Sequence, residues 1–123
     1  MGLTNAGRDF TARAIINDSP TFFTSANAHL GVGNSSTAFA TSQTDLVGTN
    51  VRKGMDGGYP QRTNNNLTFS ATFGDNEANF TWNEWGIFNA SSGGTMLNRK
   101  VNTSLGTKSG GIWNFEVTLE INN

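Results

Sequence analysis

The sequence predicts a mainly β fold, an antiparallel β-sandwich or meander with one N-terminal amphipathic helix. Within the segment 112–121, apolar and polar residues alternate without interruption from 113 to 121. Three further strand-like segments precede it from residue 67 onwards, separated by short turns rich in Gly, Asn and Ser. A helical spacing of apolar residues occurs only near the N-terminus. Alternation indicates strands, and strands joined by short turns pair antiparallel.

Length and composition narrow the function classes. The 123 residues suit one domain, 1–123, and the absence of cysteine removes thiolate catalysis, zinc clusters and disulfides. Eight basic and nine acidic residues give a net charge of −1, without the basic surplus of a nucleic-acid binder. No apolar run approaches the ~18 residues of a membrane span, and no apolar signal region opens the chain. We expect no cofactor, metal, nucleic acid or membrane partner.

The segment 3–18, "LTNAGRDFTARAIIND", is the expected helix. Thr4 or Asn5 can cap it, because both side chains offer an oxygen to the free N–H groups of the first turn. The segment 17–20, "NDSP", ends it. Helical spacing groups its apolar residues in one stripe, which we expect to cover one side or end of a sheet. The residues of this stripe are Ala6, Phe10, Ala14 and Ile15.

The first expected strand is 27–33, "NAHLGVG", with Ala28, Leu30 and Val32 pointing inward and His29 outward. From 34 to 66 no period is visible. So long an irregular segment is unusual in a compact domain, and indicates a functional loop, a contact arm or a strand without a clear pattern. The piece "TNVRK", 49–53, is a candidate edge strand.

The second half predicts strands at 67–73, 79–88, 95–101 and 112–121. The second of these is apolar on both faces, so we expect it to be covered on both sides. Strict alternation puts Phe80, Trp82, Glu84, Gly86 and Phe88 on one of its faces. The inward residues of the first strand are Leu67, Phe69, Ala71 and Phe73, and those of the last are Trp113, Phe115, Val117, Leu119 and Ile121.

Glu84 stands between two tryptophans and is the one candidate for catalysis. A carboxylate in apolar surroundings is costly unless it is paired, and can serve as a general acid. A glycosidase needs a second carboxylate, and the nearest, Asp75 and Glu77, lie in a turn. We therefore expect no enzyme, and a structural Glu84 that accepts from loop amides or pairs with a base such as Arg99. On that view Glu84→Gln costs little and Glu84→Ala costs ~1–3 kcal/mol.

Two other polar motifs give only weak indications of a catalytic or metal-binding site. His29 is the only histidine, and no nucleophile-elbow pattern accompanies it. The turn "GDNE", 74–77, has two carboxylates but lacks the spacing of an EF-hand loop.

Apolar residues in the expected loops are candidates for a subunit interface. Aromatic residues are enriched at such interfaces, although in loops they can also cap the ends of a core. Because the net charge is close to zero, copies of the chain do not repel one another. We expect a homo-oligomer, with contact residues Phe22, Phe23, Phe39, Met55 and Tyr59.

The order of motifs resembles the N-terminal tail-collar fibre domain of tailed bacteriophages. The motifs are "LTNAGRDFTARAI", "ANAHLGVGNSSTAF", "TDLVG", "NLTFSATFGDNEANFTWNEWGIFNASSGGTMLNRK" and a strand ending "FEVTLEI", with "NEWGIF" the most specific. The resemblance covers nearly the whole chain. It implies a non-enzymatic virion structural protein, assembled in the host cytoplasm, in which Glu84 belongs to a recurrent hairpin.

The resemblance also implies the partners. Collar domains normally begin long fibre proteins, whereas this chain stops where the fibre would start. We therefore expect a free-standing tail or fibre-attachment adaptor that contacts a tail, fibre or major capsid protein. By analogy with fibre-type assemblies, its homo-oligomer is a trimer. The alternative is a capsid decoration protein on the head. A further alternative, from another class, is a glycan-binding or glycan-cleaving module that uses Trp82, Glu84 and Trp85.

Overall fold

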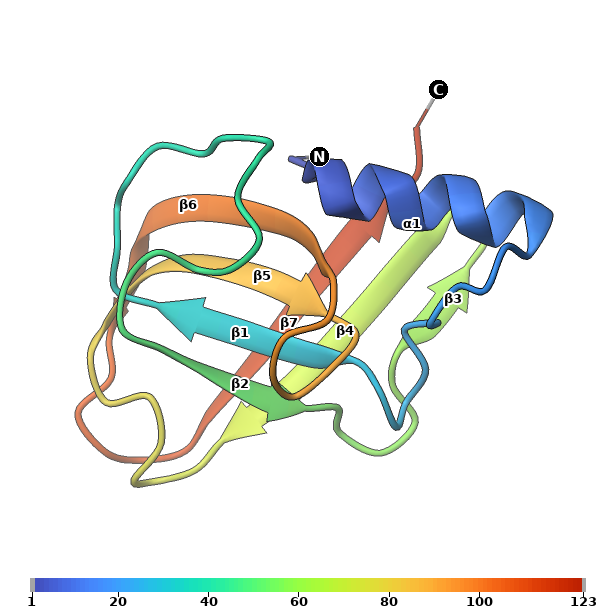
Figure 1. Ribbon diagram of the computed structural model, residues 1–123. Helices are drawn as coiled ribbons and strands as arrows, with labels where there is room; N and C mark the ends of the chain where they lie inside the picture. The colour runs from blue at the N-terminus through green and yellow to red at the C-terminus, as the bar shows by residue number, and fades with distance from the viewer. Residues whose placement is uncertain (1, 123) are drawn as a thin grey trace.

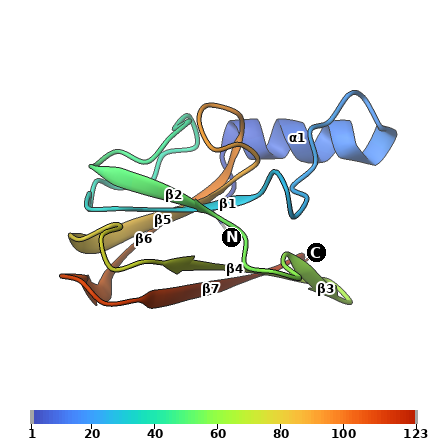
Figure 2. The same cartoon turned by 90° about the horizontal axis from the view of Figure 1, so that it is seen from below.

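A computed structural model describes residues 2–122 as two antiparallel sheets in two layers, with one helix at one end (Figures 1 and 2). The four-stranded sheet has the order β2-β1-β5-β6 and the three-stranded sheet the order β3-β4-β7. The strands of the first are β1 (His29–Gly33), β2 (Asn50–Gly54), β5 (Thr81–Phe88) and β6 (Met96–Thr107). Those of the second are β3 (Gln61–Thr63), β4 (Asn66–Phe73) and β7 (Trp113–Glu120). The predicted mainly β class with an N-terminal helix is confirmed.

The strand order shows that the fold is a sandwich of two sheets and not a meander. β5 and β6 form a hairpin, but β4 pairs with β7 and makes no ladder with β5. The chain therefore crosses from one sheet to the other after β2, after β4 and again after β6. Because strands from both halves of the chain alternate between the layers, the two sheets enclose a common core.

Helix α1 (Asn5–Ile16) begins where the first turn contacts β6. Thr4 is the cap: its hydroxyl accepts from the Gly7 amide at 2.9 Å and donates to the Met96 carbonyl at 2.5 Å. A Cβ atom on Gly7 would lie 2.1 Å from the Leu97 carbonyl oxygen. Only glycine allows the helix to approach the strand this closely. The helix ends at Asn17, whose φ of 55° is left-handed.

The predicted apolar stripe is right for three residues and wrong for Ile15. Ala6, Phe10 and Ala14 are half-buried, whereas Ile15 is 79% exposed. The buried Gly7 shows which face of the helix meets the sheet. Ala14 lies close to that direction, and Ile15 is turned a further ~100° around the axis. Ile15 therefore points past the edge of the contact.

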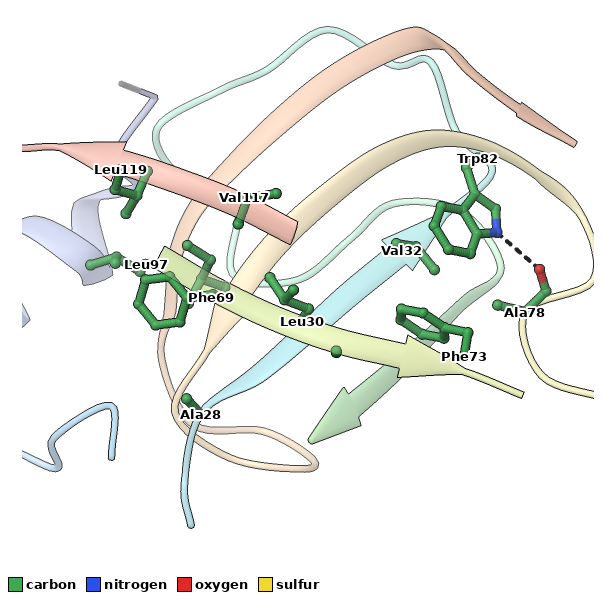
Figure 3. Close-up of a cluster of buried hydrophobic side chains, with 12 residues drawn as sticks. Ala28, Leu30, Val32, Phe69, Phe73, Ala78, Trp82, Leu97, Val117 and Leu119 are labelled. Carbon is green, nitrogen blue, oxygen red and sulfur yellow. Dashed lines mark hydrogen bonds between the residues drawn. The ribbon is translucent and has the colours of Figure 1, made fainter. Parts of the chain in front are cut away.

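The core lies between the two sheets (Figure 3). Ala28, Leu30 and Val32 of the first predicted strand are all fully buried, as the alternation predicts, and His29 is half-buried. Trp82 is also buried, and its indole Nε1 donates to the Ala78 carbonyl at 2.9 Å. The other fully or nearly buried members of this cluster are Phe69, Ala71, Phe73, Ile87, Leu97, Val117 and Leu119.

The segment 34–66 contains two strands. The candidate at 49–53 is confirmed as the edge strand β2, shifted by one residue. β3 has no counterpart in the sequence-based expectation, because its three residues are all exposed and show no alternation. Residues 34–49 form no strand and lie over the outer face of the four-stranded sheet, where Leu46 packs with Phe88 and Met96.

The last strand differs from its prediction at one end. Val117 and Leu119 are buried, and Trp113 and Phe115 are half-buried against the core. Ile121, predicted to point inward, is 51% exposed. It follows the last residue of β7 and lies at the open end of the sandwich, so alternation no longer implies burial there.

Candidate functional site

An irregularity between β5 and β6 decides which side chains surround Glu84. Trp82 pairs with Gly106 and Glu84 with Val101, so two steps along β5 correspond to five along β6. The extra residues interrupt the alternation of side chains. Trp82 and Trp85 both face inward and both contact the Phe115 ring, at centroid distances of 5.5 and 6.0 Å.

Glu84 therefore points to the opposite side from Trp82, and the prediction that they share a face is wrong. Its carboxylate lies under the segment 34–49, on the outer face of the four-stranded sheet. The expectation that β5 is covered on both sides is confirmed, since Trp82 is buried inside and Phe88 outside.

Both carboxylate oxygens of Glu84 accept hydrogen bonds. Oε2 accepts from the amides of Ser35 at 3.0 Å and Gly48 at 2.8 Å. Oε1 accepts from the Val47 amide at 2.9 Å and from Arg99 Nε at 2.9 Å. Both kinds of contact considered from the sequence, loop amides and Arg99, are present together. The side chain is 0% exposed, so no solvent-borne substrate reaches it.

Arg99 extends the same network. Its side chain is fully buried, and Nη1 donates to the Thr37 carbonyl at 2.9 Å and to Gln43 Oε1 at 3.2 Å. Nη2 has no acceptor among residues 2–122. The ion pair and its amide donors hold both ends of the segment 34–49 against the sheet. A Cβ on Gly33 would lie 2.5 Å from Glu84 Oε2, which accounts for a glycine under the carboxylate.

The carboxylates of the 74–77 turn accept hydrogen bonds within the protein. Glu77 accepts from the Gly74 amide at 2.6 Å and from Lys53 Nζ at 2.9 Å. Asp75 Oδ1 accepts from the Gly111 amide at 2.7 Å. No group of three metal-ligand side chains occurs within residues 2–122. These contacts tie the crossing between the sheets to β2 and to the β6–β7 turn.

The Glu77 contacts predict a dependence of stability on pH. The Gly74 amide, and after it Lys53, lower the pKa of the Glu77 carboxyl below its usual 4.5. A lowered folded-state pKa contributes stability above the unfolded-state pKa, and this is lost as the pH falls through the folded-state pKa. We expect Glu77→Gln to be destabilised at pH 7 and to differ little from the parent near pH 3.

The measurement is urea unfolding of both chains at pH 7 and pH 3. Glu116→Gln is the matched control, because Glu116 is exposed and forms no ion pair among residues 2–122. A Glu77→Gln variant that differs from the parent equally at both pH values would contradict the expected linkage.

The five interface candidates have different environments. Phe22 is 48% exposed. Phe23 and Met55 are partly buried against the chain's own core, as capping residues would be. Phe39 and Tyr59 are half-buried. The structure thus leaves Phe22 as the most accessible of the five.

An apolar groove, here called the α1 groove, opens beside Phe22 at the end of the sandwich. It has a volume of about 360 Å³. Phe10 lies at its helical wall and packs edge-on to Phe22 and Phe23, at centroid distances of 6.4 and 4.9 Å. Its remaining lining residues are Leu3, Thr11, Thr24, Leu67, Phe69, Leu97, Leu119 and Ile121.

Exposed apolar side chains adjoin this groove. Ile121 lines it and is half exposed, and Ile15 lies one turn beyond Thr11 on the same helix. The helical spacing of apolar residues predicts a buried Ile15, and the alternation of the last strand predicts a buried Ile121. Ile16, Val47 and Ile112 are exposed as well, and sequence reasoning identified none of them. For Ile15 and Ile16, the available signal was their position as a pair of β-branched residues at the end of the helix, where few packing partners remain.

A second cavity, the β6–β7 cavity, has a volume of about 610 Å³ and lies between those two strands. Trp85 and Phe39 line it, together with Lys100, Val101 and Leu119. Its other lining residues are Gly2, Ala38, Asn98, Arg99, Thr118, Glu120 and Asn122. Of the three residues proposed for a glycan site, only Trp85 reaches this cavity. Trp82 is in the core, and Glu84 is covered by the segment 34–49.

Comparison with models of known protein families and with functionally characterised proteins found no match. No helix within residues 2–122 is both long and apolar enough to cross a membrane.

Proposed function

We propose that this protein is a non-enzymatic bacteriophage virion structural protein that self-associates and attaches to a larger component of the particle. The observation that carries this proposal is the α1 groove with its exposed apolar rim. The resemblance to tail-collar domains supplies the context, a tail or fibre-attachment adaptor. The buried ion pair of Glu84 and Arg99 supports a structural role for the one carboxylate that lies between tryptophans.

The α1 groove has the character of a contact surface. Phe22 and Ile121 are exposed apolar side chains that line it, and Ile15 lies one helical turn beyond Thr11. All other lining residues except Thr11 and Thr24 are apolar. Exposed contiguous apolar surface on a monomer is typical of interaction sites and ligand grooves. A net charge of −1 imposes little repulsion between copies. These features support a symmetric homo-oligomer, and the analogy with fibre-type assemblies favours a trimer.

The alternative location is the capsid surface, where the protein would act as a decoration protein. Self-association and attachment to the particle are common to both locations, so the groove does not favour one over the other. Labelling the protein on purified virions distinguishes them: an adaptor is present in a few copies at the tail, and a decoration protein covers the head.

A glycan-binding role is a second candidate, and the observation that favours it is Trp85 in the β6–β7 cavity. Aromatic side chains stack on sugar rings, and Asn122 and Glu120 could bond hydroxyl groups there. Glycan cleavage receives less support, because Glu84 accepts four hydrogen bonds and is fully buried. Binding of oligosaccharides that Trp85→Ala abolishes would favour this candidate.

Self-association is tested by removing apolar surface from the groove rim. We expect the double variant Phe22→Ser with Ile15→Ser to associate at least about tenfold more weakly than the parent, since each substitution withdraws a side chain worth ~1–3 kcal/mol on full burial. Analytical ultracentrifugation across a range of concentrations gives the association constants.

The control is Ile112→Ser. Ile112 is 73% exposed but precedes β7, whereas Ile121 and the groove lie after its other end. Its association should equal that of the parent. A parent that stays monomeric in solution, and whose copies do not touch on the particle, would show that the self-association proposal is wrong.

A further inference from the structure

The free edge of β7 offers main-chain groups for pairing with a further strand. β7 is the last strand of the three-stranded sheet and, within residues 2–122, pairs only with β4. The pairing is regular along its whole length, from Asn66 opposite Glu120 to Phe73 opposite Trp113. Natural sheets protect such edges with charged side chains, Pro or bulges. β7, "WNFEVTLE", has no Pro and no bulge against β4, and its charged side chains are Glu116 and Glu120.

The hydrogen-bond pattern shows which main-chain groups are free. The Ile121 amide donates to the Asn65 carbonyl at 2.8 Å, in the same register as the β4–β7 ladder. In an antiparallel pair every second residue bonds to the partner strand, so the odd-numbered residues of β7 bond to β4. The N–H and C=O groups of Glu116, Thr118 and Glu120 therefore point away from β4, toward the open edge.

A cavity lies beside this edge. The sheet containing β6 has four strands, and the sheet containing β7 has three. The β6–β7 cavity is lined there by Val101 of β6, Leu119 of β7 and Trp85 of β5. No residue of β4 lines the cavity, which places it on the free side of β7. The volume of about 610 Å³ is sufficient for several side chains.

We propose that the β7 edge accepts an extended segment of a partner protein as a fourth strand, with apolar side chains of that segment filling the β6–β7 cavity. Main-chain hydrogen bonds would provide affinity, and the cavity would select side chains at alternate positions. This inference deepens the attachment function proposed above and rests on it only for the identity of the partner.

The chemistry of the segment follows from the residues opposite it. Val117 and Leu119 face the core, so the residues that pair with them point inward and are apolar. Glu116 and Glu120 are exposed and form no ion pair among residues 2–122, so the residues opposite them are Lys or Arg. The segment has the pattern basic, apolar, any residue, apolar, basic, and the pattern reads the same in both directions.

The charges also argue that the occupant is not a second copy of this chain. No two basic residues in the sequence are four positions apart. Like charges directly opposite one another destabilise a sheet, and two β7 edges would bring four glutamates to one seam. The partner is therefore a different protein that offers a basic extended arm.

The probe is a synthetic nine-residue peptide with Lys-Val-Thr-Val-Lys at its centre, added to the full chain. We expect binding to slow hydrogen exchange of the Glu116, Thr118 and Glu120 amides by at least about tenfold, as NMR measures it, with smaller changes at Val117 and Leu119. A peptide with Glu in place of both Lys should bind at least about tenfold more weakly.

Two sets of variants test the edge itself. Thr118→Pro removes an edge N–H and should abolish binding, whereas Thr118→Ala retains the N–H and should preserve it. Glu116→Lys with Glu120→Lys should reverse the preference between the two peptides. The charge reversal changes only exposed side chains, so it remains decisive if the proline variant does not fold.

Several results would overturn the inference. These are the absence of peptide binding at about millimolar concentration, binding without protection of the three amides, and an unchanged preference in the charge-reversed variant. Saturation of the cavity by an oligosaccharide, with no effect of the peptide, would assign it to glycans instead. None of these results affects self-association through the α1 groove, which sedimentation measures separately.

Discussion

Replacing Glu84 with alanine is expected to lower the free energy of unfolding by about 3–5 kcal/mol, because it leaves the buried guanidinium of Arg99 without its counter-charge. Three loop amides would also lose their acceptor. This loss exceeds the ~1–3 kcal/mol expected from the sequence, where the number of contacts was unknown. Urea unfolding measures the difference.

The isosteric change Glu84→Gln should be nearly as costly, contrary to the expectation from the sequence. A carboxylate accepts on both oxygens, and both are used. A glutamine has one acceptor oxygen, so its NH₂ group must face an amide or Arg99 as a second donor. The variant also leaves Arg99 unpaired.

Glu120→Gln, an exposed carboxylate without an ion pair among residues 2–122, is the matched control and should be close to neutral. A double variant, Glu84→Gln with Arg99→Met, should recover part of the loss, because the unpaired charge is gone. Full stability of Glu84→Gln alone would show that the ion pair does not hold the segment 34–49.

Trp82→Ala is the second large effect, with an expected loss of about 3–5 kcal/mol. Trp82 is 2% exposed, and its ring contacts Phe73, Trp113 and Phe115 edge-on at centroid distances of 5.1, 5.0 and 5.5 Å. Its removal leaves a cavity between the sheets and takes away one of the two donors to the Ala78 carbonyl, the other being the Phe80 amide. For a domain whose total stability is ~5–15 kcal/mol, this is enough to unfold a marginal chain.

Trp113→Ala provides the comparison. Because Trp113 is only half-buried, this substitution should lower the free energy of unfolding less than Trp82→Ala does. Thermal and urea unfolding of the two variants gives the order. If Trp113→Ala is the more damaging change, the inward orientation of Trp82 is wrong.

The two surfaces identified above have separate roles in the proposed function. The α1 groove lies at one end of the sandwich and is lined mainly by apolar side chains, which suits contact between copies of a nearly neutral chain. The β7 edge offers main-chain groups and two glutamates that form no ion pair with any described residue, which suits a basic extended arm. A protein with both surfaces can self-associate and bind another component of a particle at the same time.

Much of the fold could be predicted where it depends on local pattern. Thr4 caps the helix because capping needs only a side-chain oxygen next to the free N–H groups. The inward residues of β1 and the centre of β7 follow from alternation, which the backbone imposes on any strand. The edge strand β2 was also recognisable, despite its short pattern.

The candidate site was predictable only in its parts. Glu84 and Arg99 could be proposed as partners, because a carboxylate among apolar residues requires a donor. The loop amides that complete the site come from 35 to 48, a segment with no periodicity. Which amides meet a carboxylate depends on how the loop folds over the sheet, and no local pattern in the sequence expresses that.

The sequence by itself determined the mainly β class, the position of the helix and the residues that line the core in regular strands. Tertiary structure alone decided that β4 pairs with β7, that Trp82 and Glu84 lie on opposite faces, and that Ile15 and Ile121 are exposed. The reason is physical: periodicity is a property of one strand or helix, whereas pairing, irregular register and burial depend on segments far away in the chain. The free edge of β7 belongs to the second class, because an edge exists only once every other strand has found its partner.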